Sequence, residues 1–228
     1  MYLYRFKHKY FTLKILSLLV LTVLGACKKN PADIKEVYNN NFEQTDLSKI
    51  SGGLISLYNF TNVLGFYNND GFKITLNNLE QHDLITVSFD LYIHDSWSGN
   101  SKGPINITDG PDIWEMKVDE DPYIRTTFSN TGDCNGGVFC LQQSYPRNFP
   151  FSYDIKTGAF NKNLPGVCLL KNMPGGTSLY KIEKTILHKK GTLIVEFKDE
   201  LKQSNATNPL CDESWSLDNL VIKIATLK

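Results

Sequence analysis

The hydrophobic positions of this chain recur with a period of two over much of its length. Apolar side chains alternate with polar ones in six segments, which is typical of strands with one buried face and one face in water. Short clusters of asparagine and glycine separate these segments and indicate turns. The six segments are 72–76, 85–93, 114–118, 124–128, 193–197 and 220–224.

Many short strands predict an all-β fold, which we expect to be a two-sheet antiparallel β-sandwich of the jelly-roll type. No stretch has a helical period with caps, although residues 43–50 could form a single turn. Residues 129–178 interrupt the alternation and contain Gly-Gly pairs, several prolines and three cysteines. Long segments without periodicity are usually functional or cross-linked, so we expect a loop excursion pinned by disulfides.

The N-terminus has the features of an export signal. Four basic residues precede an apolar run over residues 15–24, and no acidic residue occurs before Asp33. This run is shorter than the ~20 residues that span a bilayer, so it predicts a secretory signal over residues 1–26. The alternative is an N-terminal membrane helix.

The sequence Leu24-Gly25-Ala26-Cys27 resembles the lipobox of bacterial lipoprotein signals. The resemblance implies that Cys27 is the first mature residue and carries diacylglycerol and palmitate-type acyl chains. It implies a lipid-anchored protein of the cell envelope, in the outer membrane on its periplasmic side or at the cell surface. We expect residues 27–36 to form a polar tether and residues 37–228 to form the β-sandwich domain.

Charge and composition exclude one class of partner. The chain has 24 basic and 24 acidic residues, and four of the basic ones lie in the predicted signal. The mature part is therefore mildly acidic and contains no basic stripe, so we expect no nucleic-acid binding.

Four cysteines remain after Cys27, and an even number in an exported chain suggests disulfides. The pairing we favour joins Cys134 to Cys140 and Cys168 to Cys211, because Gly136 and Gly137 allow a tight turn between the first two. Pairing of Cys140 with Cys168, or four reduced thiols, remain alternatives. Zinc is weakly supported, because the sequence has no CxxC pair and no histidine near these cysteines.

Both ends of the predicted domain carry a short family resemblance. Asn41-Phe42-Glu43 and the closing segment 214–222 (SWSLDNLVI) resemble jelly-roll carbohydrate-binding modules, and are similar to MAM and other concanavalin A-like sandwiches. The resemblance implies that the first and last strands are neighbours and that Glu43 and Asp218 share a structural Ca²⁺ ion. Carboxylate oxygens suit calcium. Alternatively, Glu43 is a surface residue and Asp218 accepts hydrogen bonds in a turn.

A second polar cluster follows the segment 85–93. We predict that Trp97 stacks on a sugar ring while Asp95, Asn100 and Asp112 bind hydroxyl groups. The alternative is an Asx-rich turn with no ligand. Trp114 and Trp215 are expected to be buried.

The sequence contains no catalytic motif of the G-x-S-x-G or H-E-x-x-H kind, and no pair of carboxylates with a glycosidase spacing. We therefore expect an envelope-anchored β-sandwich that binds a glycan or another surface ligand without catalysis. The alternatives are a structural or adhesive module that contacts other envelope proteins and, less favoured, a glycoside hydrolase.

Overall fold

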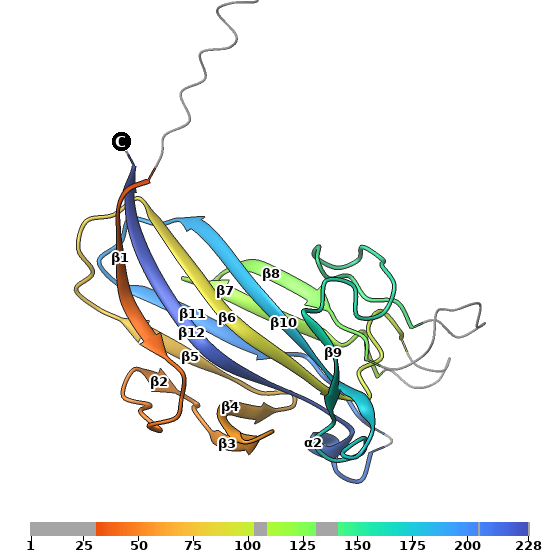
Figure 1. The fold of residues 1–228 in the computed structure, drawn as a ribbon. Helices are drawn as coiled ribbons and strands as arrows, with labels where there is room; N and C mark the ends of the chain where they lie inside the picture. Colours follow the sequence, from red (N-terminus) through yellow and green to blue (C-terminus); the bar gives the residue numbers. More distant parts are fainter. Residues whose placement is uncertain (1–30, 103–108, 131–140, 205, 228) are drawn as a thin grey trace, which may run out of the picture.

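A computed structural model describes residues 31–102, 109–130, 141–204 and 206–227. It consists of two antiparallel sheets packed face to face (Figure 1), which confirms the predicted β-sandwich. The larger sheet has the order β3 (Ile55–Tyr58), β4 (Thr61–Tyr67), β12 (Glu213–Leu227), β6 (Leu84–Asp95), β10 (Pro174–Leu187) and β9 (Asn161–Pro165), with β1 (Pro31–Asn40) also paired to β12.

The smaller sheet has the order β2 (Ile50–Ser51), β5 (Gly71–Leu76), β11 (Leu193–Asp199), β7 (Ile113–Val118) and β8 (Asp121–Thr127). A single turn of helix, α2 (Pro209–Asp212), precedes β12. Within the described residues, no helix has the length and apolar character needed to cross a bilayer.

The alternating segments form the strands that the sequence predicts. In β6, the odd-numbered positions from Ile85 to Ile93 are buried between the sheets. Trp114 and Trp215 are both fully buried, as expected, and pack edge to face with ring centroids 5.9 Å apart. The core is therefore a layer of aliphatic and aromatic side chains between the two sheets.

The first and last strands lie side by side (Figure 1), as the resemblance at the domain ends implies. Pro31 pairs with Leu227 and Asn40 pairs with Leu220. Residues 31–36, which the sequence assigns to the tether, are part of β1. The side chains of residues 33–36 are exposed, so their spacing gave no sign of a strand that pairs through its backbone.

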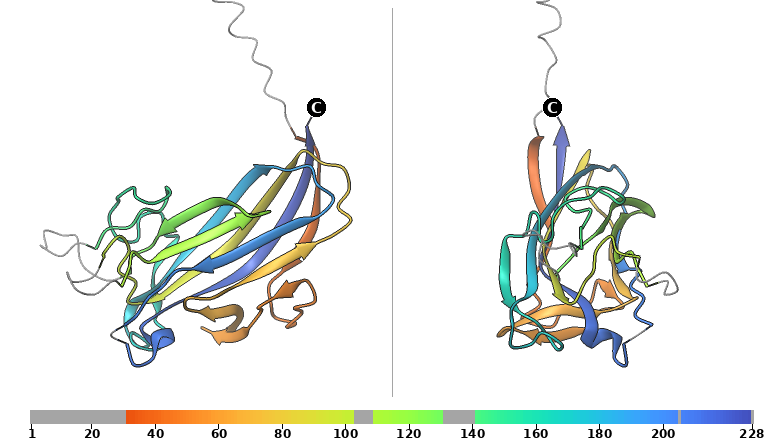
Figure 2. Two further views of the ribbon diagram at one scale, coloured as in Figure 1. Left: turned by 180° about the vertical axis from the view of Figure 1, so that it is seen from behind. Right: turned by 90° about the vertical axis from the view of Figure 1, so that its right-hand side faces the viewer.

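One edge of the sandwich is open (Figure 2). Strand β9 pairs with β10 only between Pro174 and Leu179, so the later part of β10 has no strand on that side among the described residues. Strand β8 is the edge of the smaller sheet. Between these two strands lies the irregular chain that follows residue 140, within the predicted loop excursion.

Candidate functional site

The structure places Trp97 in the core, which corrects the prediction that it stacks on a ligand. Its side chain has no exposed surface, and its ring packs against Phe128 with centroids 6.3 Å apart. The indole Nε1 donates a hydrogen bond to the backbone oxygen of Ser214 at 2.8 Å. With its polar atom bonded and its ring covered, Trp97 has no face that a sugar could reach.

The two neighbouring carboxylates are also turned inward. Asp95 is fully buried and accepts backbone N–H bonds from Val167, Cys168 and Leu170, the last at 2.8 Å. The Oδ2 atom of Asp112 accepts the N–H of Ser98 at 2.5 Å and that of Gly99 at 2.8 Å. Burial raises the pKa of both carboxyl groups, and these donors counteract the increase. Both residues hold loops together instead of facing a ligand.

Asn100 also has a structural role. Its Nδ2 atom donates to the backbone oxygen of Phe151 at 2.9 Å, and its Oδ1 atom accepts from Ser144 Oγ at 3.0 Å. These bonds attach the loop after β6 to the irregular chain around residue 150. The predicted binding residues Asp95, Trp97, Asn100 and Asp112 therefore all stabilise the fold through internal contacts.

Glu43 and Asp218 are brought near each other by the pairing of the terminal strands. The charge of Glu43 contributes to raising the pKa of Asp218, although burial is the main cause. Each already has local partners: Asn62 donates its N–H to Glu43 at 3.0 Å, and Asn219 donates its N–H to Asp218 at 2.7 Å. No group of three or more His, Cys, Asp or Glu side chains in the described ranges is arranged to hold a metal ion. The calcium site stays a prediction.

The predicted disulfide between Cys168 and Cys211 is present, and the loop that it closes contains all of β10 and all of β11. It joins the loop after β9 to helix α2, next to the N–H groups that Asp95 binds. Cys27, Cys134 and Cys140 lie outside the described residues.

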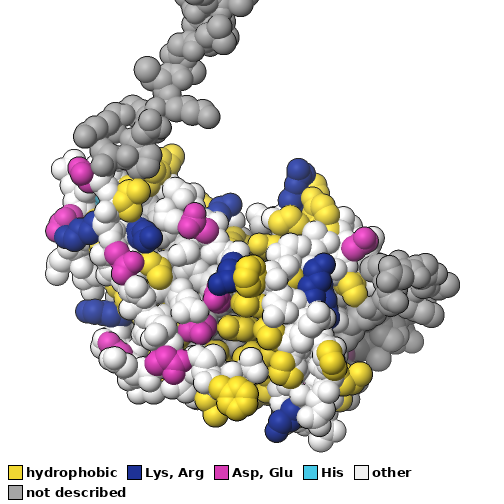
Figure 3. Space-filling model, in the orientation of Figure 1, with side chains coloured by type: hydrophobic (Ala, Val, Ile, Leu, Met, Phe, Trp, Pro, Cys, Tyr) yellow, Lys and Arg dark blue, Asp and Glu magenta, His cyan; other side chains and the backbone are white. Residues whose placement is uncertain are grey.

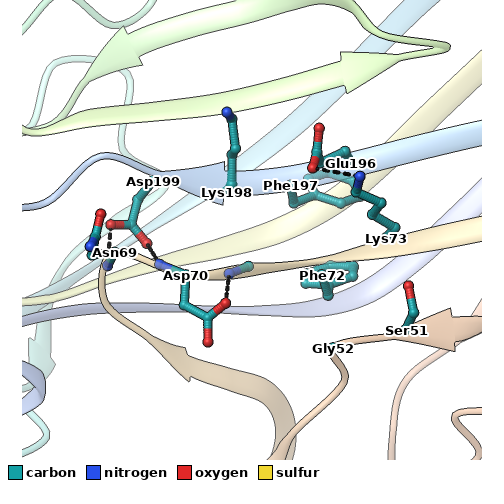
Figure 4. A pocket seen from close by; sticks show the side chains of 11 residues that line it. Ser51, Gly52, Asn69, Asp70, Phe72, Lys73, Glu196, Phe197, Lys198 and Asp199 are labelled. Atoms are coloured by element: carbon teal, nitrogen blue, oxygen red, sulfur yellow. Dashed lines mark hydrogen bonds and ion pairs between the residues drawn. The ribbon is translucent and has the colours of Figure 1, made fainter.

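One hollow lies beside the smaller sheet, between β5, β11 and the turn at Gly52 (Figure 4). Its charged groups are already satisfied within the protein. Lys73 Nζ lies 3.1 Å from Glu196 Oε1, and Asp199 accepts the N–H of Asn69 at 2.6 Å and that of Asp70 at 3.3 Å. Few bonding groups remain for a ligand here.

A larger hollow of about 450 Å³, which we term the edge cleft, opens between β8, β10 and residues 145–151. This volume is within the range of small-molecule sites. The face shown in Figure 3 has an indentation at its upper margin, with hydrophobic and basic side chains beside it. The lining residues are Tyr123, Ile124, Tyr145, Pro146, Arg147, Asn148, Phe151, Ile182, Glu183 and Lys184.

The outer wall of the edge cleft is fixed in place by β8. Tyr145 N donates to Thr127 O at 3.2 Å, and Phe149 N donates to Arg125 O at 2.8 Å. In return, the Arg125 N–H donates to the Asn148 side chain at 3.0 Å. The wall is thus held before any ligand arrives, which reduces the entropy lost on binding.

Several residues that line the edge cleft have side chains with unused bonding capacity. The Arg147 guanidinium lies 4.8 Å from the centroid of the Phe151 ring, and Phe151 is 49% exposed. Arg147, Glu183 and Lys184 form no ion pair with any described residue. Aromatic surface, free charges and an amide therefore converge on one concavity.

Sequence reasoning missed this site because its residues come from three distant segments. Tyr123 belongs to β8, Arg147 to a loop, and Lys184 to β10. The available signal was the aromatic and proline-rich stretch 145–151 (YPRNFPF), which contains no core periodicity.

Comparison with known proteins yields structural likenesses only. No family model matches the chain, and no curated protein matches its sequence. A family GH115 4-O-methyl-α-glucuronidase with specificity for decorated arabinogalactans matches at 13% identity and a TM-score of 0.37, over 84% of this chain and 18% of that one. The chain thus spans less than a fifth of that protein.

Two smaller domains match over nearly their whole length. A family 35 carbohydrate-binding module from Clostridium thermocellum matches at 8% identity and a TM-score of 0.34, over 84% of this chain and 98% of that one. The K3 cleaved adhesin domain of Lys-gingipain from Porphyromonas gingivalis W83 matches at 13% identity and a TM-score of 0.36, over 82% and 98%. The neighbours thus include carbohydrate-binding modules and adhesin domains, but the likenesses are too weak to indicate a ligand.

Proposed function

We propose that this protein is a non-catalytic glycan-binding module, held in the bacterial cell envelope by a lipid on Cys27. The observation that carries the proposal is the edge cleft. Sugar rings present C–H faces that pack on aromatic side chains, and hydroxyl groups that bond to amides and charged groups. Tyr123, Phe151, Asn148 and Lys184 supply these complementary groups within a preformed concavity.

The composition of the edge cleft favours binding over hydrolysis. Glycosidases generally use two carboxyl groups placed on either side of the scissile bond. Glu183 is the single carboxylate among the described residues that line the cleft. Among these described residues, a ligand bound there meets no second carboxylate that could act as nucleophile or base.

A glycan array with the purified domain tests the proposal. We expect binding by the wild-type protein, and loss of binding in Phe151→Ala. Phe60→Ala is the matched control, because Phe60 is 98% exposed at the tip of the β3–β4 hairpin and lies outside the edge cleft. An array without any signal, or a signal that Phe151→Ala leaves unchanged, would contradict the edge-cleft proposal.

The second candidate is an adhesive module that contacts another envelope protein. The observation that favours it is the exposed apolar surface of the β3–β4 hairpin, where Leu57 is 71% exposed and Phe60 is 98% exposed. Exposed apolar clusters often mark protein contacts. Loss of envelope-protein binding in Phe60→Ala, with Phe151→Ala behaving as wild type, would support this candidate over glycan binding.

The anchor has its own test. Cys27→Ser removes the thiol that would carry the lipid, so we expect no incorporation of labelled fatty acid and release of the domain from membranes. If the variant stays membrane-bound at high salt, the anchor proposal is wrong.

A further inference from the structure

A second hollow continues the edge cleft beyond Tyr123. It has a volume of about 330 Å³ and shares Tyr123 with the first, so this side chain stands between them. Both hollows use residues from the β8 side and from the later part of β10 or the turn that follows it. Together they form a groove along the open edge of the sandwich, with one aromatic side chain at its middle.

The two hollows differ in how their charges are used. In the second hollow, Lys190 Nζ lies 3.0 Å from Asp119 Oδ2, and Lys189 Nζ lies 3.2 Å from Asp83 Oδ1. Its cations are therefore neutralised within the protein. In the edge cleft, Arg147 and Lys184 have no such partner among the described residues, and together they outnumber the single carboxylate of Glu183.

We infer that the ligand is an oligosaccharide that spans Tyr123, with an acidic sugar bound by Arg147 and Lys184 in the edge cleft and neutral sugar units in the second hollow. This inference rests on the proposed function and specifies its ligand class. A guanidinium forms two parallel hydrogen bonds to a carboxylate, which fixes the orientation of the acidic unit. The Tyr123 ring is placed to pack against the sugar at the junction.

Titration calorimetry with defined oligosaccharides tests the inference. The acidic probes are oligogalacturonates of increasing length, and the neutral probes are galacto-oligosaccharides of the same lengths. We expect the acidic series to bind more tightly, with an affinity that rises with length until both hollows are filled. Added salt is expected to weaken the acidic series selectively, because charge pairing near the surface is screened.

Three variants test which residues bind the oligosaccharide. Arg147→Gln is expected to weaken oligogalacturonate binding by roughly tenfold to a hundredfold, the usual effect of losing a charged hydrogen bond, and to spare neutral probes. Lys171→Gln is the matched control, because Lys171 is exposed and lines neither hollow. Tyr123→Ala is expected to remove the gain in affinity with length. Circular dichroism of each variant verifies that it is folded.

Each negative result contradicts a different part of the inference. Equal affinity for acidic and neutral probes, with no effect of Arg147→Gln, overturns the acidic ligand and leaves glycan binding intact. A single sugar that binds as tightly as the longest oligomer overturns the span across Tyr123. If neither series binds and the glycan array is also empty, the proposed function itself is wrong.

Discussion

Two irregular regions of this sandwich differ in how their side chains are used. The loop from Asp95 to Asp112 contains several Asp, Asn and Ser residues and one Trp, yet its key polar side chains turn inward and bond to backbone groups. The segment 145–151 is held by β8 mainly through its own backbone, with one further bond to the Asn148 side chain, and it lines the edge cleft with Arg147 and Phe151. In the first region, polar side chains stabilise the loop. In the second, backbone hydrogen bonds do most of this, so side chains such as Arg147 and Phe151 are available to a ligand.

The difference shows why residue type alone is a poor guide to a binding site. An aspartate or a tryptophan can serve a ligand only if its bonding atoms and ring faces are not already used by the fold. The following predictions distinguish residues that stabilise the fold from residues that bind a ligand, beginning with the largest expected effect.

Trp97→Ala should destabilise the domain by about 3–5 kcal/mol, because it leaves a cavity and removes the N–H partner of Ser214. Phe151→Ala should cost about 1 kcal/mol or less, because the side chain is half-exposed, and should instead abolish ligand binding. Urea denaturation measures both values. If Trp97→Ala unfolds at the wild-type midpoint, the assignment of Trp97 to the core is wrong.

Loss of the Cys168–Cys211 disulfide should cost on the order of 3–4 kcal/mol on the chain-entropy account, since the bridge closes a loop with a sequence separation of 43. The matched variant is Cys134→Ser, whose predicted bridge to Cys140 would close a much shorter loop and should matter less. Thermal unfolding without reductant compares them. Equal losses in the two variants would contradict this ranking.

Glu213→Gln should change how stability depends on pH. Burial and the nearby charges of Asp112 and Asp212 raise the pKa of Glu213, so the folded state holds its proton more tightly than the unfolded chain. This contribution is complete below the unfolded pKa and is lost as pH rises. The variant should therefore melt higher than wild type at about pH 8, and the two should differ least at about pH 4.

Edge-cleft substitutions offer the control for this titration. Lys184→Gln, at an exposed position, should shift the melting temperature equally at both pH values. If Glu213→Gln shows the same flat response, burial of Glu213 does not control the pH dependence.

The smallest expected effect concerns calcium at Glu43 and Asp218. If an ion ties the terminal strands together, chelation should lower the melting temperature by a few degrees, and added calcium should restore it. Burial raises the pKa of Asp218 to about 6, so protons should compete with the ion below that pH. An unchanged melt over a wide range of calcium concentrations, with Asp218→Asn matching wild type, would remove the prediction.

The sequence predicted the sandwich well because strand alternation is a local signal. Segments such as 85–93 carry their buried face in their own spacing, and the structure places them in the core. The start of strand β10 was not recognised, since Pro174 and the two glycines that follow lie inside a stretch interpreted as a loop.

The candidate site was harder to predict because it depends on which side chains the fold leaves unbonded. Polar neighbours suggested an exposed Trp97, but those neighbours turn inward to bond backbone groups. Tyr123, Arg147 and Lys184 meet only through the packing of two sheets, and no spacing rule connects them.

The pairing of β1 with β12 also has a mechanical consequence. The chain enters the sandwich at Pro31, and β1 runs from there along β12 to Asn40 (Figure 1). A pull on the chain at Pro31, directed away from the domain, acts along the strand and loads its cross-strand hydrogen bonds in shear, many at once. Tension between a membrane anchor and a bound ligand would thus pass through β1, although this strand contributes few buried side chains.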